Sequence, residues 1–315
     1  MFDVIIVGGG VSAYGAAMYC GRFNMKTLII QKIKGGTIIL TDIVENYPGF
    51  KKLTGMELAK NIEEHALEYK TVSVEDGEVT KIEKQKDGTF KLRTLEGNNY
   101  ATQTVIYATG TEWKKLGAPG EKEYMNRGVH YCALCDGTFY KNKVIGVVGG
   151  GDSATKEALL LTTLASKVYM IVRKDKLRAE PINLDRALAN EKLEVIYETE
   201  VKEIKGNGKN VSSVLLSKQY KGKNELELSA VFVEIGHDAI TKLAVDAGVA
   251  VDKSKEIIIN RLSETNVPGF FAAGDCCDTA FKQAITGVAE GVTASYSANL
   301  YIEKLKHEAK KEKKK

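Results

Sequence analysis

The sequence has no apolar run that approaches the roughly 20 residues needed to cross a bilayer as a helix, so we expect no membrane partner. Its first residues lack the basic stretch and cleavage site of a secretory leader, and we expect a cytoplasmic protein. Cysteine is scarce, with five in 315 residues, and this small odd number excludes the disulfide framework of a small secreted protein. The four histidines show no spacing that suggests a metal site, and we expect structural roles for them.

An excess of one charge sign is also absent from most of the chain. The formal net charge is +4, and residues 303–315 alone hold seven lysines against three glutamates. The remainder is therefore close to neutral, which argues against a nucleic-acid partner. We expect the short basic end to be a solvated helix end.

The sequence does contain one short pattern twice. An apolar strand leads into Gly8-x-Gly10-x-x-Ala13, and a second one leads into Gly149-x-Gly151-x-x-Ala154. A glycine turn between a strand and a helix binds the pyrophosphate of a dinucleotide at the helix N-terminus. The chain is long enough for two domains. The repeat therefore predicts two domains of one α/β type, each with a dinucleotide site.

The residue at the end of the second strand differs between the two copies. In the first copy it is Gln31, followed by Lys32, where an acidic residue would bind the ribose of NAD. A flavin dinucleotide tolerates an amide there, so the first site favours FAD. In the second copy the strand leads to Arg173, Lys174 and Arg178, whose charges suit the 2′-phosphate of NADPH. A solvated basic loop is the alternative interpretation.

A single Cys-x-x-Cys, at Cys132 and Cys135, lies between the two glycine turns. In a chain with strand–helix–strand units this spacing indicates redox chemistry. Asp136 follows directly and is placed to supply the proton that a leaving sulfur needs in thiol–disulfide exchange. A zinc site completed by Cys276-Cys277 is the alternative, but adjacent cysteines are poor tetrahedral partners. We expect the three remaining cysteines to pack in the interior.

An antiparallel β insertion is expected in each half, because turn signals such as Asp76-Gly77 and Asp87-Gly88 separate segments of strand composition. The expected strands are 72–87 and 89–95 in the first half, and 194–204, 211–218 and 225–234 in the second.

These motifs together resemble the low-molecular-weight thioredoxin reductases of bacteria and archaea, over residues 4–301. The further segments that carry the resemblance are Gly35-Gly36, 44–49, 108–110, Gly236-His237, Gly274-Asp275 and 282–284. The resemblance implies an α/β fold with two Rossmann-like dinucleotide-binding domains, each built of three layers in the order ββα. A discontinuous FAD domain, 1–112 and 242–315, would enclose an inserted NADPH domain, 113–241, that carries the Cys-x-x-Cys. It also implies a homodimer.

The resemblance implies a thioredoxin-disulfide reductase, in which electrons pass from NADPH to FAD, to the Cys132–Cys135 disulfide, and then to thioredoxin or a thioredoxin-like protein. In such reductases the second cysteine faces the flavin and the first attacks the partner, which gives these roles to Cys135 and Cys132. Asp136 would be the acid–base group. The family also implies a swing of the NADPH domain, with hinges near 111–115 and 238–242.

The resemblance and the two glycine motifs also predict which residues bind each cofactor. Those expected at FAD are Gly8, Gly10, Ser12, Ala13, Gln31, Lys32, Gly35, Gly36, Thr37, Asn46, Val79, Ala108, Thr109, Gly110, Gly274, Asp275, Lys282, Gln283 and Ala284. Those expected at NADPH are Gly149, Gly151, Asp152, Ser153, Ala154, Arg173, Lys174 and Arg178.

The chain departs from the family pattern at several of these positions. Thr37 stands where glutamine is common, Lys282 where arginine is common, and Leu134 is unusual between the cysteines. Lys174 replaces the second arginine of the phosphate-binding pair. Lysine keeps the charge but loses the bidentate fork, so we expect a weaker preference for NADPH over NADH.

Three competing functions make different predictions. An FAD-dependent dithiol oxidase of the same fold, using oxygen or another donor or acceptor in place of NADPH, has no need of the basic residues after the second copy. A ferredoxin–NADP reductase of related fold lacks the dithiol. A nonenzymatic protein with a structural zinc site would be colourless.

Overall fold

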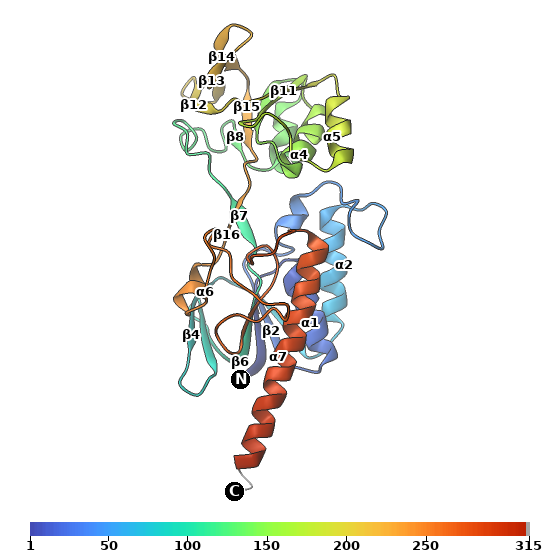
Figure 1. The fold of residues 1–315 in the computed structure, drawn as a ribbon, viewed down its shortest axis with the longest axis vertical. Coiled ribbons are helices and arrows are strands. Elements are labelled where there is room, and N and C mark those ends of the chain that lie inside the picture. Colours follow the sequence, from blue (N-terminus) through green and yellow to red (C-terminus); the bar gives the residue numbers. More distant parts are fainter. Residues whose placement is uncertain (313–315) are drawn as a thin grey trace. The chain divides into compact units, whose positions relative to one another are not determined.

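The computed structural model describes residues 1–312 and divides into two compact units. Unit 1 consists of residues 1–112 together with the chain from 239 onward, and unit 2 consists of residues 113–238 (Figure 1). Each unit has its own sheet, which is entirely parallel in unit 2 and mixed in unit 1. The expected α/β class with two dinucleotide-binding-type sheets is confirmed. Within the described residues, no helix has the length and apolarity to span a membrane.

The sheet of unit 1 has the order β3-β2-β1-β6-β5-β4, and β17 pairs with β6. Its parallel strands are β1 (Phe2–Val7), β2 (Thr27–Gln31), β3 (Val72–Asp76), β6 (Asn99–Tyr107) and β17 (Phe270–Ala272). The antiparallel strands are β4 (Val79–Lys84) and β5 (Phe90–Thr94). The helical elements are α1 (Val11–Arg22), η1 (Thr37–Leu40), α2 (Gly55–Leu67), α6 (Lys242–Asp246) and α7 (Ala284–Glu312).

Small residues allow α1 to lie close to this sheet. Ala13, Ala16 and Ala17 are fully buried on one side of α1, and they pack with Ala294 and Ala298 of α7 in the same core. A second core on the opposite face of the sheet contains alternate residues of the same strands. Because β1 is buried on both faces, its sequence contains a continuous apolar run. This packing fixes the N-terminus of α1 at the end of β1.

The sheet of unit 2 is entirely parallel, in the order β11-β10-β9-β15-β8. Its strands are β8 (Val129–His130), β9 (Val144–Val148), β10 (Lys167–Ile171), β11 (Leu193–Ile196) and β15 (Ala230–Val233). The helical elements are α3 (Ala133–Asp136), η2 (Gly137–Tyr140), α4 (Asp152–Thr162) and α5 (Pro181–Leu188). A three-stranded antiparallel sheet of β12 (Val201–Gly206), β13 (Val211–Tyr220) and β14 (Lys223–Glu227) completes the unit.

The chain passes between the units twice, through neighbouring strands. β7 (Thr111–Trp113) leads into unit 2 and β16 (His237–Ala239) leads out of it, and the two pair with each other in a small sheet (Figure 1). Unit 2 is therefore an insertion whose two ends are held together.

The expected β insertions were partly wrong, because three of their segments belong to the parallel sheets. Residues 72–76 form β3, which pairs in parallel with β2, and the Asp76-Gly77 signal marks the end of that strand and not a hairpin. Residues 193–196 and 230–233 likewise form β11 and β15, parallel strands of unit 2. Composition alone did not separate an edge strand of a parallel sheet from a meander.

Candidate active site and dinucleotide-binding turns

The Cys-x-x-Cys motif forms a disulfide at the start of the short helix α3. The Cα atoms of Cys132 and Cys135 are 5.4 Å apart, and the backbone amide of Cys135 donates a hydrogen bond to Cys132 Sγ at 3.1 Å. Three residues of separation place both side chains on the same side of one helical turn. Cys132 is buried, whereas Cys135 is exposed. The pair can take up two electrons as a dithiol and return them by exchange with another disulfide.

Asp136 follows the disulfide and contacts His130. The carboxylate oxygen Oδ2 lies 2.9 Å from His130 Nδ1, and the other ring nitrogen, Nε2, is 2.8 Å from the hydroxyl of Tyr140. His130 is buried at the end of β8, which delivers it to the redox turn, whereas Asp136 is partly exposed. The sequence predicts only a structural role for this histidine, because none of the four histidines has a spacing that suggests a metal site.

Glu157 of α4 is a second residue that the sequence did not reveal. Its Oε2 accepts a hydrogen bond from the backbone amide of Ala133 at 2.7 Å, and its carboxyl group is hydrogen-bonded to that of Glu234, just after β15. Burial, followed by repulsion within the pair, raises the pKa of Glu234, and burial also raises the pKa of Glu157. The pair therefore retains a proton at neutral pH.

The second glycine turn joins β9 to α4 and leaves room for a ligand. Gly149 has φ of +150°, and a Cβ there would overlap the carbonyl oxygen of Glu234, so only glycine fits. A Cβ on Gly151, at the N-cap of α4, would meet nothing within 4 Å. The backbone at the start of this 11-residue helix is thus bare, as a pyrophosphate requires. The turn is closed by the amide of Arg178, which donates to Gly150 O at 2.7 Å.

The basic residues expected at the 2′-phosphate are all exposed near this turn. Among the residues that the structure describes, Arg173, Lys174 and Arg178 make no ion pair, so their charges remain available. Asp152 is different, because its Oδ1 accepts from Glu180 N and from the Asn183 side chain, both at 2.9 Å. Its Oδ2 also pairs with Lys156 at 2.8 Å. Asp152 therefore holds the start of α5 in place.

The first glycine turn joins β1 to α1 with the same geometry. Gly8 has φ of +134°, and a Cβ there would overlap the carbonyl oxygen of Ala108 at the end of β6. Gly10 is the N-cap of α1 and pairs with Gly35 in an isolated bridge. The turn thus brings together the 8–13 and 35–36 segments and Ala108, all expected at FAD.

Two segments far apart in the sequence complete this region of unit 1. The Asn46 side chain donates to Gln283 Oε1 at 2.9 Å, across 237 positions. Lys282 Nζ donates to Asp275 O at 2.8 Å and also to Cys277 O, and it pairs with Glu256 at 3.2 Å. Lys282 thereby braces the loop that carries Asp275.

Gln31 is held in an internal network. Its Oε1 accepts from the Tyr14 hydroxyl and its Nε2 donates to Asp76 Oδ1, both at 2.8 Å, and the residue is buried. Asp76 ends β3, so a carboxylate of the neighbouring strand lies against Gln31. The sequence did not predict this contact, because residues 72–76 were expected in an antiparallel insertion.

The other residues expected at FAD lie on several elements of unit 1. Val79 is the first residue of β4 and is buried in the core. Lys32 is exposed and pairs with Glu78 at 2.8 Å, and Thr109 donates to Ile240 O at 2.8 Å. Ser12 and Ala13 are in α1, Thr37 begins η1, Ala284 begins α7, and Gly36, Gly110 and Gly274 have positive φ.

The remaining cysteines lie in the interior of unit 1. Cys20, Cys276 and Cys277 are free and buried, and the sulfurs of the adjacent pair are 3.9 Å apart. In residues 1–312 no group of three metal-ligating side chains comes together.

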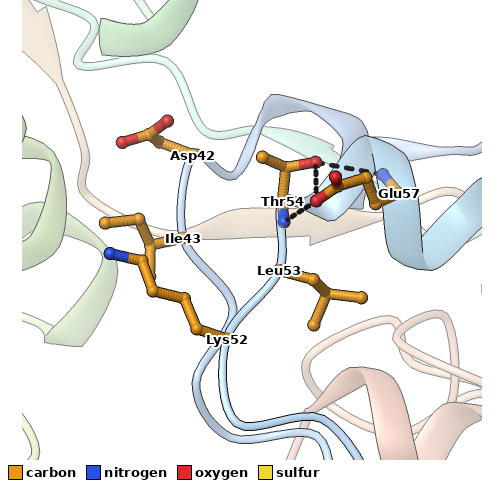
Figure 2. A pocket seen from close by; sticks show the side chains of 6 residues that line it. All are labelled: Asp42, Ile43, Lys52, Leu53, Thr54 and Glu57. Atoms are coloured by element: carbon orange, nitrogen blue, oxygen red, sulfur yellow. Dashed lines mark hydrogen bonds between the residues drawn. The ribbon is translucent and has the colours of Figure 1, made fainter.

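An open hollow of about 370 Å³ lies at the N-terminus of α2 (Figure 2). Its lining residues are Asp42, Ile43, Lys52, Leu53, Thr54 and Glu57. Thr54 and Glu57 form a capping box, in which Thr54 Oγ1 accepts from Glu57 N at 3.1 Å and Glu57 Oε2 accepts from Thr54 N at 2.7 Å. These two residues therefore serve the helix end.

Comparison with known proteins gives consistent matches along the whole chain. The model of the pyridine nucleotide-disulphide oxidoreductases matches residues 2–291. A thioredoxin reductase of Listeria innocua is 39% identical over 97% of this chain and 95% of its own length, and one of Treponema pallidum is 41% identical over 97% and 99%. The crystal structure of Lactococcus lactis thioredoxin reductase, in its FR conformation, superposes with a TM-score of 0.92 at 38% identity. That match covers 96% of this chain and all of the other.

Proposed function

This chain belongs to the pyridine nucleotide-disulphide oxidoreductase family, and within that family we infer that it is an NADPH-dependent thioredoxin reductase, a flavoprotein with thioredoxin as its substrate. The observation that carries the assignment is the Cys132–Cys135 disulfide, which is built into the same unit as the second glycine turn. Relatives that match over nearly the full length bear the same name.

We assign FAD to unit 1 and NADPH to unit 2. The first glycine turn, the Asn46–Gln283 pair and the loop braced by Lys282 would hold FAD, and the start of α4 with Arg173, Lys174 and Arg178 would hold NADPH. When bound, FAD accepts a hydride from NADPH and delivers two electrons to a disulfide. The proposed FAD domain is 1–112 and 242–315, with the NADPH domain at 113–241. The paired strands β7 and β16 are the proposed hinge for the domain swing.

Exchange with thioredoxin uses the side chains of the redox turn. Asp136 takes the proton of the Cys132 thiol, and the Cys132 thiolate attacks the partner's disulfide. A bond forms between Cys132 and one partner sulfur, the partner's own S–S bond breaks, and Asp136 gives the proton to the leaving sulfur. Cys135 then attacks Cys132, which re-forms the enzyme disulfide, and its proton passes to the second partner sulfur. Two electrons and two protons have moved to the partner.

Cys132 is buried in the oxidised turn, so this order of attack requires the turn to open on reduction. Cys135, which is exposed, is assigned to face the flavin. The protein partner is thioredoxin or a thioredoxin-like protein, and we propose a cytoplasmic homodimer. A reductase or oxidase that uses another electron donor would have no use for Arg173, Lys174 and Arg178, whose exposed positive charges suit a 2′-phosphate.

An anaerobic experiment tests the assignment. The purified yellow protein is mixed with NADPH, and separately with NADH, and bleaching of the flavin band is followed. We expect NADPH to bleach the flavin quickly. If neither NADPH nor NADH bleaches it, the protein uses another electron donor. In the Cys135→Ser variant, NADPH should still bleach the flavin, but the variant should not reduce thioredoxin. Thioredoxin reduction by that variant would contradict the dithiol assignment.

A further inference from the structure

His130 is a buried residue that the function above leaves unused. It ends β8 immediately before the redox turn and is 4% exposed. Its ring stacks on Phe232 of β15 and meets the edge of the Tyr140 ring, with centroids 5.3 Å apart in both pairs. An imidazole between two aromatic rings is ordinarily a packing residue, but here both ring nitrogens face polar side chains.

The contact with Asp136 determines which ring nitrogen carries the proton. Nδ1 lies 2.9 Å from Asp136 Oδ2, although the N–H is not aligned on that oxygen as in a regular hydrogen bond. A bare Nδ1 lone pair at this distance would repel the carboxylate, so the proton belongs on Nδ1. Nε2 then accepts a hydrogen bond from the hydroxyl of Tyr140, 2.8 Å away. Tyr140 thus satisfies Nε2 in the form of His130 that presents an N–H to Asp136.

The ring is uncharged at neutral pH. Burial lowers the pKa of His130, and the nearby Asp136 carboxylate only partly opposes this effect. The titratable groups that face the ring are Asp136 from α3 and Tyr140 from η2, while Phe232 of β15 is apolar. His130 therefore presents a fixed dipole to the carboxylate and does not neutralise it.

We propose that His130 is a positioning residue for the acid–base step, which holds Asp136 Oδ2 and leaves the second carboxylate oxygen as the one that carries the proton. This inference rests on the proposed function, since it takes Asp136 as the group that accepts a proton from Cys132 and returns it to the leaving sulfur. Without the ring N–H, the carboxylate rotates between orientations, only some of which present the protonated oxygen to sulfur. Such misplacement slows proton transfer without preventing it.

The test is a single turnover of the flavin-loaded protein. Enzyme reduced anaerobically with NADPH is mixed with oxidised thioredoxin, and the exchange rate is measured across pH. His130→Phe keeps the stack on Phe232 but removes both nitrogens. We expect exchange to slow to about a tenth, with a shifted pH profile and unchanged flavin bleaching. His130→Asn, whose amide N–H replaces that of Nδ1, should recover most of the rate.

A double-mutant cycle shows whether His130 acts through Asp136. In an Asp136→Asn background, His130→Phe should have almost no further effect, because the group that it positions has been removed. Additive losses of exchange rate in the double mutant would overturn the proposal. Equal losses of rate in His130→Phe and His130→Asn would also overturn it, and so would a wild-type rate and pH profile in His130→Phe.

Tyr140→Phe carries the test if His130→Phe does not fold or bind flavin. It removes only the hydroxyl that hydrogen-bonds Nε2 and holds the imidazole ring in place, so we expect the exchange rate to fall about two- to fourfold with the same shift in pH profile. A wild-type profile in this variant would overturn the proposal. Wild-type enzyme that bleaches with NADPH but reduces neither thioredoxin nor a small aromatic disulfide would contradict the proposed function itself, and the role of His130 with it.

Discussion

Glu157 accepts a hydrogen bond from the backbone amide of Ala133 at 2.7 Å, and this contact ties α4 to the first residue of the redox helix. Helix α4 begins at the second glycine turn. One rigid element therefore connects the proposed NADPH site to the disulfide. The contact also satisfies an amide whose residue is 1% exposed.

Glu157→Ala should destabilise the protein, because it leaves the buried amide of Ala133 without an acceptor. The expected loss in the free energy of unfolding is about 1–3 kcal/mol. Glu157→Gln keeps a carbonyl oxygen as the acceptor, so its free energy of unfolding should fall by less. Urea unfolding monitored by circular dichroism gives the comparison, with Glu227→Ala, an exposed glutamate of β14, as the control. Equal stabilities of Glu157→Ala and the control would show that the contact contributes nothing.

The Glu157–Glu234 pair should make stability fall as pH rises. Burial raises the pKa of both carboxyl groups above the value that they have in the unfolded chain. The stabilisation is therefore complete below the ordinary glutamate pKa of about 4.5 and is lost as pH rises through the raised values of the folded state. Urea midpoints between about pH 5 and pH 9 measure this slope. Glu234→Gln, which cannot ionise, should flatten it, and an unchanged slope in that variant would contradict the shared proton.

The second glycine turn predicts opposite effects for two neighbouring glycines. Gly151→Ala should fold normally, because its Cβ meets nothing within 4 Å, but the methyl group occupies the space expected for the pyrophosphate. We expect NADPH affinity to fall by about tenfold or more, with flavin content and melting temperature unchanged. Gly149→Ala should instead lose stability, by about 1–3 kcal/mol from backbone strain alone, because of its φ of +150°.

Titration calorimetry and thermal melts of these two variants separate the effects. Wild-type NADPH binding by Gly151→Ala would place the pyrophosphate elsewhere. Unimpaired stability of Gly149→Ala would mean that the turn relaxes around the added methyl group.

The exposed basic residues should decide the choice between NADPH and NADH. Arg173→Ala and Arg178→Ala should each weaken NADPH binding by about 10–100-fold and leave NADH binding nearly unchanged, since each removes a charge-assisted contact to phosphate. Lys174→Arg should strengthen the preference by restoring a bidentate fork. Lys176→Ala, in the same loop, is the matched control. Stopped-flow bleaching with each cofactor measures these effects, and equal losses for NADPH and NADH would reject the phosphate assignment.

The sequence predicted the parts of the site that depend on local pattern. Gly8, Gly149 and the Cys-x-x-Cys were recognisable because a positive φ, a tight turn and a three-residue spacing each restrict the choice of residue. The structure adds that the backbone approaches Gly8 and Gly149 too closely for any side chain.

The partners of those motifs could not be predicted, because they depend on how elements far apart in sequence pack together. Glu157 is 24 positions from Ala133, and its place against the redox turn follows from the packing of α3 on α4. Asp76 was missed for a related reason, since a parallel edge strand and a meander strand have similar compositions. His130 looked like an ordinary core residue, and only the contact with Asp136 sets it apart.

Unit 2 is one uninterrupted stretch of chain inserted into unit 1. The pairing of β7 with β16 holds the two ends of this stretch together. During synthesis, unit 2 is therefore complete once residue 238 has left the ribosome, and it can fold at that point. Unit 1 still lacks β17 and α7, whose Ala294 and Ala298 belong to the core around α1. A chain terminated soon after residue 240 would thus hold a finished dithiol unit but would lack the last strand and the last helix of the proposed FAD domain. If unit 1 holds the flavin as proposed, flavin incorporation would therefore require synthesis of β17 and α7.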